Sequence, residues 1–286
     1  MEASSIRPRL LLVAAALLFS TGGAAIKSAT LTGWQVASFR SGVAAMALLI
    51  GVPESRRACS KRLIPVAAAY AATLVMFVLA TRLTTAANAI FLQSTAPLYV
   101  LLLAPWLLQE HVRRSDLIYM LAVAAGMALF FLQNESAGAT APDPRRGNLI
   151  GAGSGVMWAL TVTGLRRLGR GAPGNPAMAT VALGNVMAFL AALPLAWPVT
   201  PAAGAANLLV ILYLGIVQIG VAYVCVTRAI RHVPAFEATT ILLLEPVMNP
   251  IWAWLVHGEK PGFWAVTGGA VILSATLWNT LRARLA

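Results

Sequence analysis

Charged residues are scarce in this chain of 286 residues. They make up 10% of the sequence, against 59% hydrophobic residues, whereas a soluble globular domain carries about 25% charged residues. Among the charged residues, acidic ones are the fewer, with nine Asp and Glu against 21 Lys and Arg. This composition excludes an ordinary soluble fold and indicates a chain that is embedded in lipid.

The side chains that usually carry enzymatic or metal chemistry are also few. The two cysteines, Cys59 and Cys225, cannot form a disulfide framework. The three histidines lie near the ends of apolar runs, and no Cys or His pair has metal-ligand spacing. Gly153-Ser154-Gly155 resembles a nucleophile motif but has no evident base, and no phosphate-binding loop is present. We expect no enzymatic activity, no metal, no cofactor and no ATP-driven transport by this chain alone.

Long apolar runs, by contrast, fill the sequence. About 20 apolar residues cross the roughly 30 Å of hydrocarbon in a bilayer. Residues 7–25 resemble a signal peptide, but its removal would leave nine spans, so we interpret them as part of the first helix. We predict an all-α membrane protein of ten transmembrane helices, at 9–29, 34–52, 63–81, 85–107, 116–133, 148–166, 176–197, 206–227, 235–257 and 262–281.

The basic residues are distributed unevenly between the two sides of these ten helices. Fifteen Lys and Arg fall on the side of the termini, five fall on the other side, and Arg40 lies within a helix. The positive-inside rule then places both termini in the cytoplasm. We therefore interpret the net charge of +12 as a topology signal rather than a nucleic-acid surface, and we expect a multi-pass protein of the bacterial inner membrane.

An internal repeat organises the chain. Residues 80–110 and 229–259 align at an offset of 149 positions, and each copy has a proline near its middle (Pro97, Pro246) and a glutamate at its end (Glu110, Glu259). Residues 135–147 form a linker that separates a first repeat at 1–134 from a second at 148–286. Because each repeat holds five helices, the second inserts upside down relative to the first. Inverted repeats of this kind are typical of alternating-access transporters.

Only two charged side chains, Arg40 and Glu245, are predicted well within the hydrocarbon. Glu245 lies about 15 Å from the cytoplasmic end of its helix at 1.5 Å per residue. There it could bind a substrate amine or couple transport to protons, or it could form a structural pair, for example with Arg40. Arg40 lies about six residues from the outer end of its helix, where its side chain can also extend outward to the interface.

Polar and aromatic residues at similar depth predict a substrate cavity. Any one of them could instead form a hydrogen bond between helices, but together they suit a small zwitterionic or neutral solute. Clustered Arg and Lys are absent there, which argues against phosphorylated substrates. We predict Pro97 and Pro246 as helix breaks that take part in gating. The predicted substrate-binding residues are Ser20, Thr21, Tyr70, Met76, Gln93, Ser94, Tyr99, Trp158, Thr161, Gln218, Tyr223, Glu245 and Asn249.

These features resemble the drug/metabolite transporter superfamily, in its ten-helix type with two EamA repeats. The residues that carry the resemblance are Pro97, Pro246, Glu110, Glu259, Arg40, Phe19-Ser20 and Trp158-Ala159. Among such proteins the chain is similar to YddG-type amino-acid exporters. The resemblance implies a central cavity among helices 1, 3, 4, 6, 8 and 9, with helices 5 and 10 outside it. It also implies export of amino acids, aromatic or otherwise neutral, and of related small metabolites by alternating access.

Two alternatives remain open from the sequence. The first is efflux of hydrophobic cationic drugs, with Glu245 neutralising the cation. The second is a membrane protein of another class, structural or enzymatic, with a closed core. A small-molecule substrate and membrane lipid are the expected partners, and nucleic acid is not.

Overall fold

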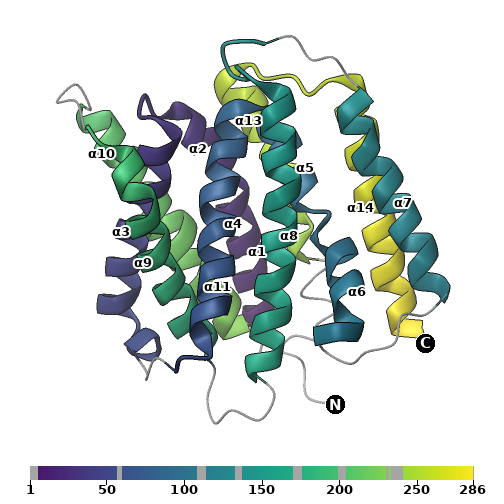
Figure 1. The fold of residues 1–286 in the computed structure, drawn as a ribbon, viewed down its shortest axis with the longest axis horizontal. Helices are drawn as coiled ribbons and strands as arrows, with labels where there is room; N and C mark the ends of the chain where they lie inside the picture. The colour runs from purple at the N-terminus through teal and green to yellow at the C-terminus, as the bar shows by residue number, and fades with distance from the viewer. Residues whose placement is uncertain are drawn as a thin grey trace.

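The computed structural model describes residues 6–56, 60–107, 114–132, 137–169, 176–198, 204–229, 232 and 241–285. Cys59, Glu110 and residues 235–240 of the predicted ninth helix lie outside this described part. Figure 1 shows the described chain as a bundle of helices that run in alternating directions, with both termini at the same end.

The first half of the chain forms α1 (Ile6–Ser20), α2 (Gly22–Ser28), α3 (Gly33–Gly51), a short 3-10 helix η1 (Pro53–Arg56), α4 (Leu63–Leu83), α5 (Ala86–Gln93), α6 (Ala96–Leu107) and α7 (Arg114–Leu132). The second half forms α8 (Pro144–Gly169), α9 (Ala177–Ala196), α10 (Ala205–Leu212), a π-helix η2 (Tyr213–Val221), α11 (Ala222–Ala229), α13 (Leu244–His257) and α14 (Phe263–Leu285). Where neighbouring pieces continue one another, they form ten spans in the described chain, as predicted.

The outer surface of the bundle is apolar. Six of the described helical segments are long and apolar enough to cross a membrane. Large hydrophobic side chains such as Ile50, Trp106 and Leu121 are 78%, 86% and 72% exposed, which suits contact with lipid rather than water. The predicted all-α membrane fold of two inverted five-helix repeats is confirmed.

The helix breaks fall just before the two repeated prolines. α5 ends at Gln93 and α6 begins at Ala96, so Pro97 is the second residue of α6. One repeat later, a turn at Leu243 precedes α13, in which Pro246 is the third residue. Proline is tolerated in the first turn of a helix, where its missing N–H would have no intrahelical partner. Each proline therefore starts a new helix instead of kinking a continuous one.

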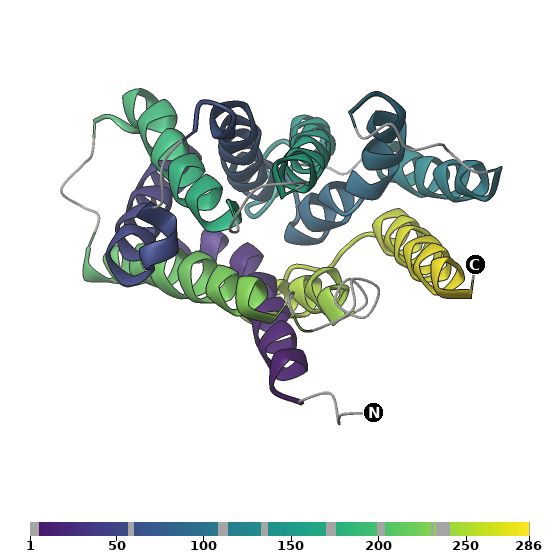
Figure 2. The ribbon, with the colours of Figure 1, turned by 90° about the horizontal axis from the view of Figure 1, so that it is seen from below.

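α7 and α14 form a flank beside the other helices, as Figure 2 shows. Glycines allow their backbones to approach closely, because a Cβ on Gly268 would lie 2.6 Å from the carbonyl oxygen of Gly126. The Tyr119 hydroxyl also lies 3.4 Å from Thr276 Oγ1 across this contact. The central helices are thus left to enclose the interior of the protein.

Candidate functional site

A cavity of about 320 Å³ lies between the two halves of the chain. Its walls come from α1, α3, α4, the α5–α6 break, α8, η2, α11, α13 and one residue of α14, Thr276. Nine of the fifteen residues predicted for substrate binding or gating line it: Tyr70, Gln93, Ser94, Pro97, Trp158, Gln218, Tyr223, Glu245 and Pro246.

The other six predicted residues do not line the cavity and form contacts elsewhere, five with neighbouring helices and Thr161 within its own helix. Ser20 Oγ accepts a hydrogen bond of 2.9 Å from Trp252 Nε1, and the Thr21 hydroxyl lies 2.7 Å from that of Tyr213. The Tyr99 hydroxyl lies 3.4 Å from Met127 Sδ, and Thr161 Oγ1 donates to the carbonyl oxygen of Met157 at 2.8 Å.

The remaining two of these six, Met76 and Asn249, pack against glycines on facing helices. A Cβ on Gly153 would lie 2.5 Å from Met76 Cε, so the methionine fills the space that this glycine leaves. A Cβ on Gly23 would likewise lie 2.5 Å from Asn249 Oδ1. Asn249 is fully buried, and its side-chain oxygen and nitrogen have no hydrogen-bond partner in the described part of the chain.

Glu245 is the acidic residue of the cavity wall. It is the second residue of α13, where the positive end of the helix dipole favours a carboxylate. The residue is partly exposed and lines the cavity. It forms no ion pair with a basic residue of the described chain, so its charge is available to a solute in the cavity that it lines.

Arg40 lines the same cavity, although it was not among the predicted site residues. It is 2% exposed and does not extend to the interface. Its Nη2 donates a hydrogen bond of 3.1 Å to the carbonyl oxygen of Leu74, near the middle of α4. The rule that selected Glu245, an ionisable group at membrane depth, would also have selected Arg40. The structural pair between Arg40 and Glu245 that the sequence left open does not form.

Aromatic rings form much of the wall between these two charges. The rings of Phe19 and Tyr223 meet edge to face with centroids 5.2 Å apart, and those of Tyr70 and Tyr223 do so at 5.6 Å. Trp158 completes this aromatic wall from α8. Such a wall can hold the apolar part of an organic solute by ring contacts, while the two charges bind polar groups of opposite sign.

A buried polar network closes the bundle at the end away from the termini. Lys27 Nζ forms a salt bridge of 3.0 Å with Glu259 Oε1, and both side chains are 4% exposed. Lys27 also donates to the carbonyl oxygens of Thr84, at 2.9 Å, and Thr140. Glu259 accepts a hydrogen bond of 3.0 Å from the backbone N–H of Ala86 at the start of α5. The network thus joins α2 and α5 of the first repeat to the end of α13 in the second.

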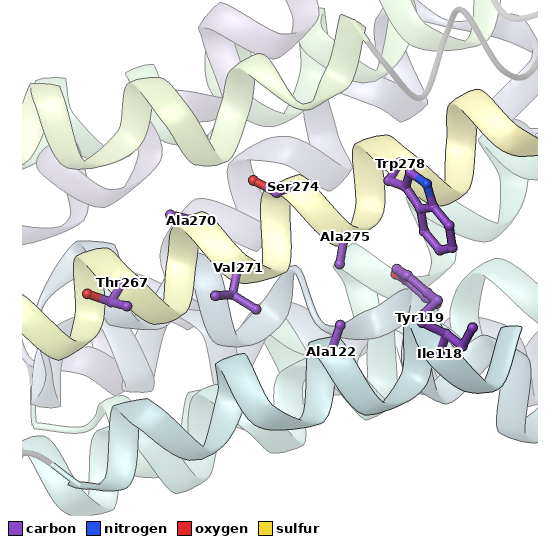
Figure 3. Close-up of a pocket in the computed structure, with 9 residues that line it drawn as sticks. All are labelled: Ile118, Tyr119, Ala122, Thr267, Ala270, Val271, Ser274, Ala275 and Trp278. Carbon is purple, nitrogen blue, oxygen red and sulfur yellow. The ribbon is translucent and has the colours of Figure 1, made fainter. Parts of the chain in front are cut away.

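A second hollow, of about 490 Å³, lies between α7 and α14 (Figure 3). Val271 and Ala275 point from α14 toward α7, and Ala122 and Tyr119 point the other way. It is larger than the central cavity but has no charged residue in its lining, so it does not provide a site for a charged solute. Among the described residues, no group of three or more His, Cys, Asp and Glu could hold a metal ion.

Comparisons with known proteins agree with this architecture. The sequence model of the EamA-like transporter family matches residues 7–132 and 145–281. Pseudopaline exporter CntI proteins from two strains of Pseudomonas aeruginosa are 26% identical to this chain over 276 residues, which is 94% of this chain and 94% of theirs. An uncharacterized transporter of Clostridium kluyveri is 34% identical over 73 residues, which span 26% of this chain and 24% of that protein.

A solved crystal structure also shares the fold. It superposes with a TM-score of 0.64 over 97% of both chains, at 19% sequence identity. The family match covers both halves of the chain and extends from the first described helix to the last. The protein is therefore a multi-pass membrane transporter and not an enzyme, and it belongs to the EamA-like transporter family.

Proposed function

We propose that this secondary transporter exports amino acids and related small metabolites by alternating access, with the central cavity as its substrate site. The observation that carries the proposal is the cavity itself, which both repeats line and which combines the Glu245 carboxylate with an aromatic wall. A site near the bilayer midplane at the interface of two inverted repeats is the arrangement that rocking of one half against the other requires.

The relatives support the direction of transport more than the identity of the substrate. The Pseudomonas aeruginosa relatives that match nearly the whole chain are exporters of pseudopaline. They favour export of a small organic solute, but they do not favour the YddG-type amino-acid exporters in particular. The amino-acid specificity proposed here depends on the chemistry of the cavity. We further propose that the protein resides in the bacterial inner membrane with both termini in the cytoplasm.

Purified protein in liposomes would test this function directly. We expect saturable exchange of at least one labelled amino acid from a panel of neutral and aromatic ones, measured with and without a proton gradient. Protein-free liposomes serve as the control. If no amino acid of the panel crosses faster than in those liposomes, amino-acid transport is excluded.

Efflux of hydrophobic cations is the second candidate, and one feature of the cavity favours it. Glu245 lies among aromatic rings, and a lipophilic cation can bind both a carboxylate and the faces of aromatic rings. Cells that express the protein can be loaded with amino acid or challenged with lipophilic cations. Protection against the cations, together with unchanged amino-acid export, would favour this candidate.

Access of water to the cavity can be tested by thiol labelling in a background from which Cys59 and Cys225 have been removed. Gln93 lines the cavity and donates to Ser154 Oγ at 2.9 Å, whereas Thr161 is 1% exposed and lies outside the lining. We expect a polar maleimide to label Gln93→Cys rapidly and Thr161→Cys slowly. Equally slow labelling of both would indicate a closed core.

A further inference from the structure

The guanidinium of Arg40 has unused hydrogen-bonding capacity next to the cavity. Of its five N–H groups, one donates to the carbonyl oxygen of Leu74 at 3.1 Å. Nε is buried and has no hydrogen-bond partner in the described chain, and no described carboxylate forms an ion pair with Arg40. A buried cation without a counter-charge is costly, so its retention here calls for a partner that the described part of the chain does not supply.

The backbone around Arg40 holds the side chain in place. A Cβ on Gly215, in the π-helix η2, would lie 2.8 Å from the carbonyl oxygen of Arg40 and 2.6 Å from Val43 Cγ1. η2 therefore lies directly against α3 at this residue. On the other side, the hydrogen bond to Leu74 ties the guanidinium to α4. π-helical segments are rare and often occur at functional sites. Here η2 contributes Gln218 to the cavity and also fixes the position of Arg40.

We propose that Arg40 binds the carboxylate of the substrate while Glu245 binds its amine. The two residues line one cavity, belong to opposite repeats and are not paired with each other. A guanidinium binds a carboxylate through two parallel hydrogen bonds and is the side chain best suited to that group. The substrate class is then a zwitterion, with an amine at one end, a carboxylate at the other and an apolar part against Tyr70 and Tyr223. This inference rests on the proposed amino-acid transport and specifies which group of the substrate each charge recognises.

Two probes that differ only in the carboxylate separate this role from a structural one. L-phenylalanine carries both groups, and phenethylamine lacks the carboxylate. In proteoliposome exchange we expect the wild-type protein to prefer L-phenylalanine. We expect Arg40→Gln to lower L-phenylalanine exchange by about tenfold or more, the usual loss for a charge-assisted bidentate contact. Phenethylamine exchange by the same variant stays near the wild-type rate, so the preference disappears.

Two further variants sharpen the test. Arg40→Lys keeps the charge but not the planar fork, and we expect it to recover part of the preference. Arg62→Gln removes an exposed arginine at the start of α4 and is expected to change neither rate. Thermal unfolding in detergent verifies that each variant folds.

The outcomes distinguish the inference from the function on which it rests. A wild-type protein that exchanges neither probe nor any amino acid of the panel would overturn the proposed function, and the inference with it. If wild-type exchange of L-phenylalanine is intact, the inference alone fails in either of two cases. In one, Arg40→Gln slows both probes to the same extent, which indicates a structural role. In the other, it leaves the preference unchanged.

Discussion

Some polar residues of this protein line the cavity, whereas others at similar depth pack against a neighbouring helix. Glu245 and Asn249 are one helical turn apart on α13, yet Glu245 lines the cavity while Asn249 packs against Gly23 of α2. The difference follows from what lies opposite each residue. Only the carboxylate has open space in front of it, so its charge is available to a solute.

Glu245→Gln tests that charge while it keeps the shape of the side chain. We expect the variant to fold, because the carboxylate forms no ion pair that the substitution would break. Transport of amine-bearing substrates should fall by about tenfold or more, the loss expected when a charged partner is removed, and any dependence of the flux on a proton gradient should disappear. Glu54→Gln, at an exposed position in η1, is the matched control. Unchanged proteoliposome flux across pH would remove Glu245 from the mechanism.

Gly23 is the residue that makes room for Asn249. A Cβ there would lie 2.5 Å from Asn249 Oδ1 and 2.9 Å from the Cβ of Ala86. We expect Gly23→Ala to destabilise the protein by about 1–3 kcal/mol, the usual cost of overpacking. The melting temperature in detergent measures this effect. Gly51→Ala, where nothing lies within 4 Å of the new Cβ, should leave the melting temperature unchanged or slightly higher; an equal drop in both variants would contradict the packing argument.

At the scale of helices, α13 connects the cavity to the polar network at the far end. Glu245 lies in its first turn and Glu259 just beyond its last, which is about 20 Å at 1.5 Å per residue. The salt bridge between Glu259 and Lys27 joins the end of α13 to α2 of the other repeat. Movement of one repeat against the other at this end would have to separate these two residues.

Glu259→Gln should therefore loosen the bundle at the end away from the termini. Removing one partner of a buried salt bridge costs about 3–5 kcal/mol, which would favour conformations that are open at this end. Ile90 lines the cavity and is 2% exposed. We expect Ile90→Cys, in the background without Cys59 and Cys225, to react faster with an impermeant maleimide when Glu259→Gln is also present.

Lys260→Gln is the control for this experiment, because Lys260 is adjacent in sequence but exposed. It should leave the labelling rate of Ile90→Cys unchanged. A labelling rate that Glu259→Gln does not raise either would show that the salt bridge does not hold this end closed.

At the scale of the whole molecule, the ten alternating helices place both termini at one end (Figure 1). The bias of basic residues toward that end predicts that it faces the cytoplasm. The linker between the two repeats would then lie on the outer side of the membrane.

Reporter fusions in bacterial cells test this orientation. Green fluorescent protein fused after Ala286 should fluoresce, and alkaline phosphatase at the same site should be inactive. Alkaline phosphatase fused at Thr140, in the linker, should be active, because that enzyme folds only outside the cytoplasm. The reverse pattern would place the termini outside and contradict the proposed orientation.

The positions of the ten spans and their organisation in two inverted repeats followed from the sequence, because a bilayer demands apolar runs of nearly fixed length. The charge at Glu245 and the breaks before Pro97 and Pro246 could be located for the same local reason: an ionisable group or a missing N–H is conspicuous in an apolar run. The π-helix η2 has no comparable signal, because its residues are as apolar as those of the α-helices around it.

Only the tertiary structure decided which polar side chains meet in the cavity. Asn249 and Met76 were predicted there, but they pack instead into the space that Gly23 and Gly153 leave on facing helices. Arg40 could have reached the interface or paired with Glu245, and packing against α4 and η2 holds it in the cavity wall instead. The sequence determined what lies at each depth of the membrane, since depth depends on residues along one helix. The direction of each side chain depends on the neighbouring helices, and these come together only in the folded bundle.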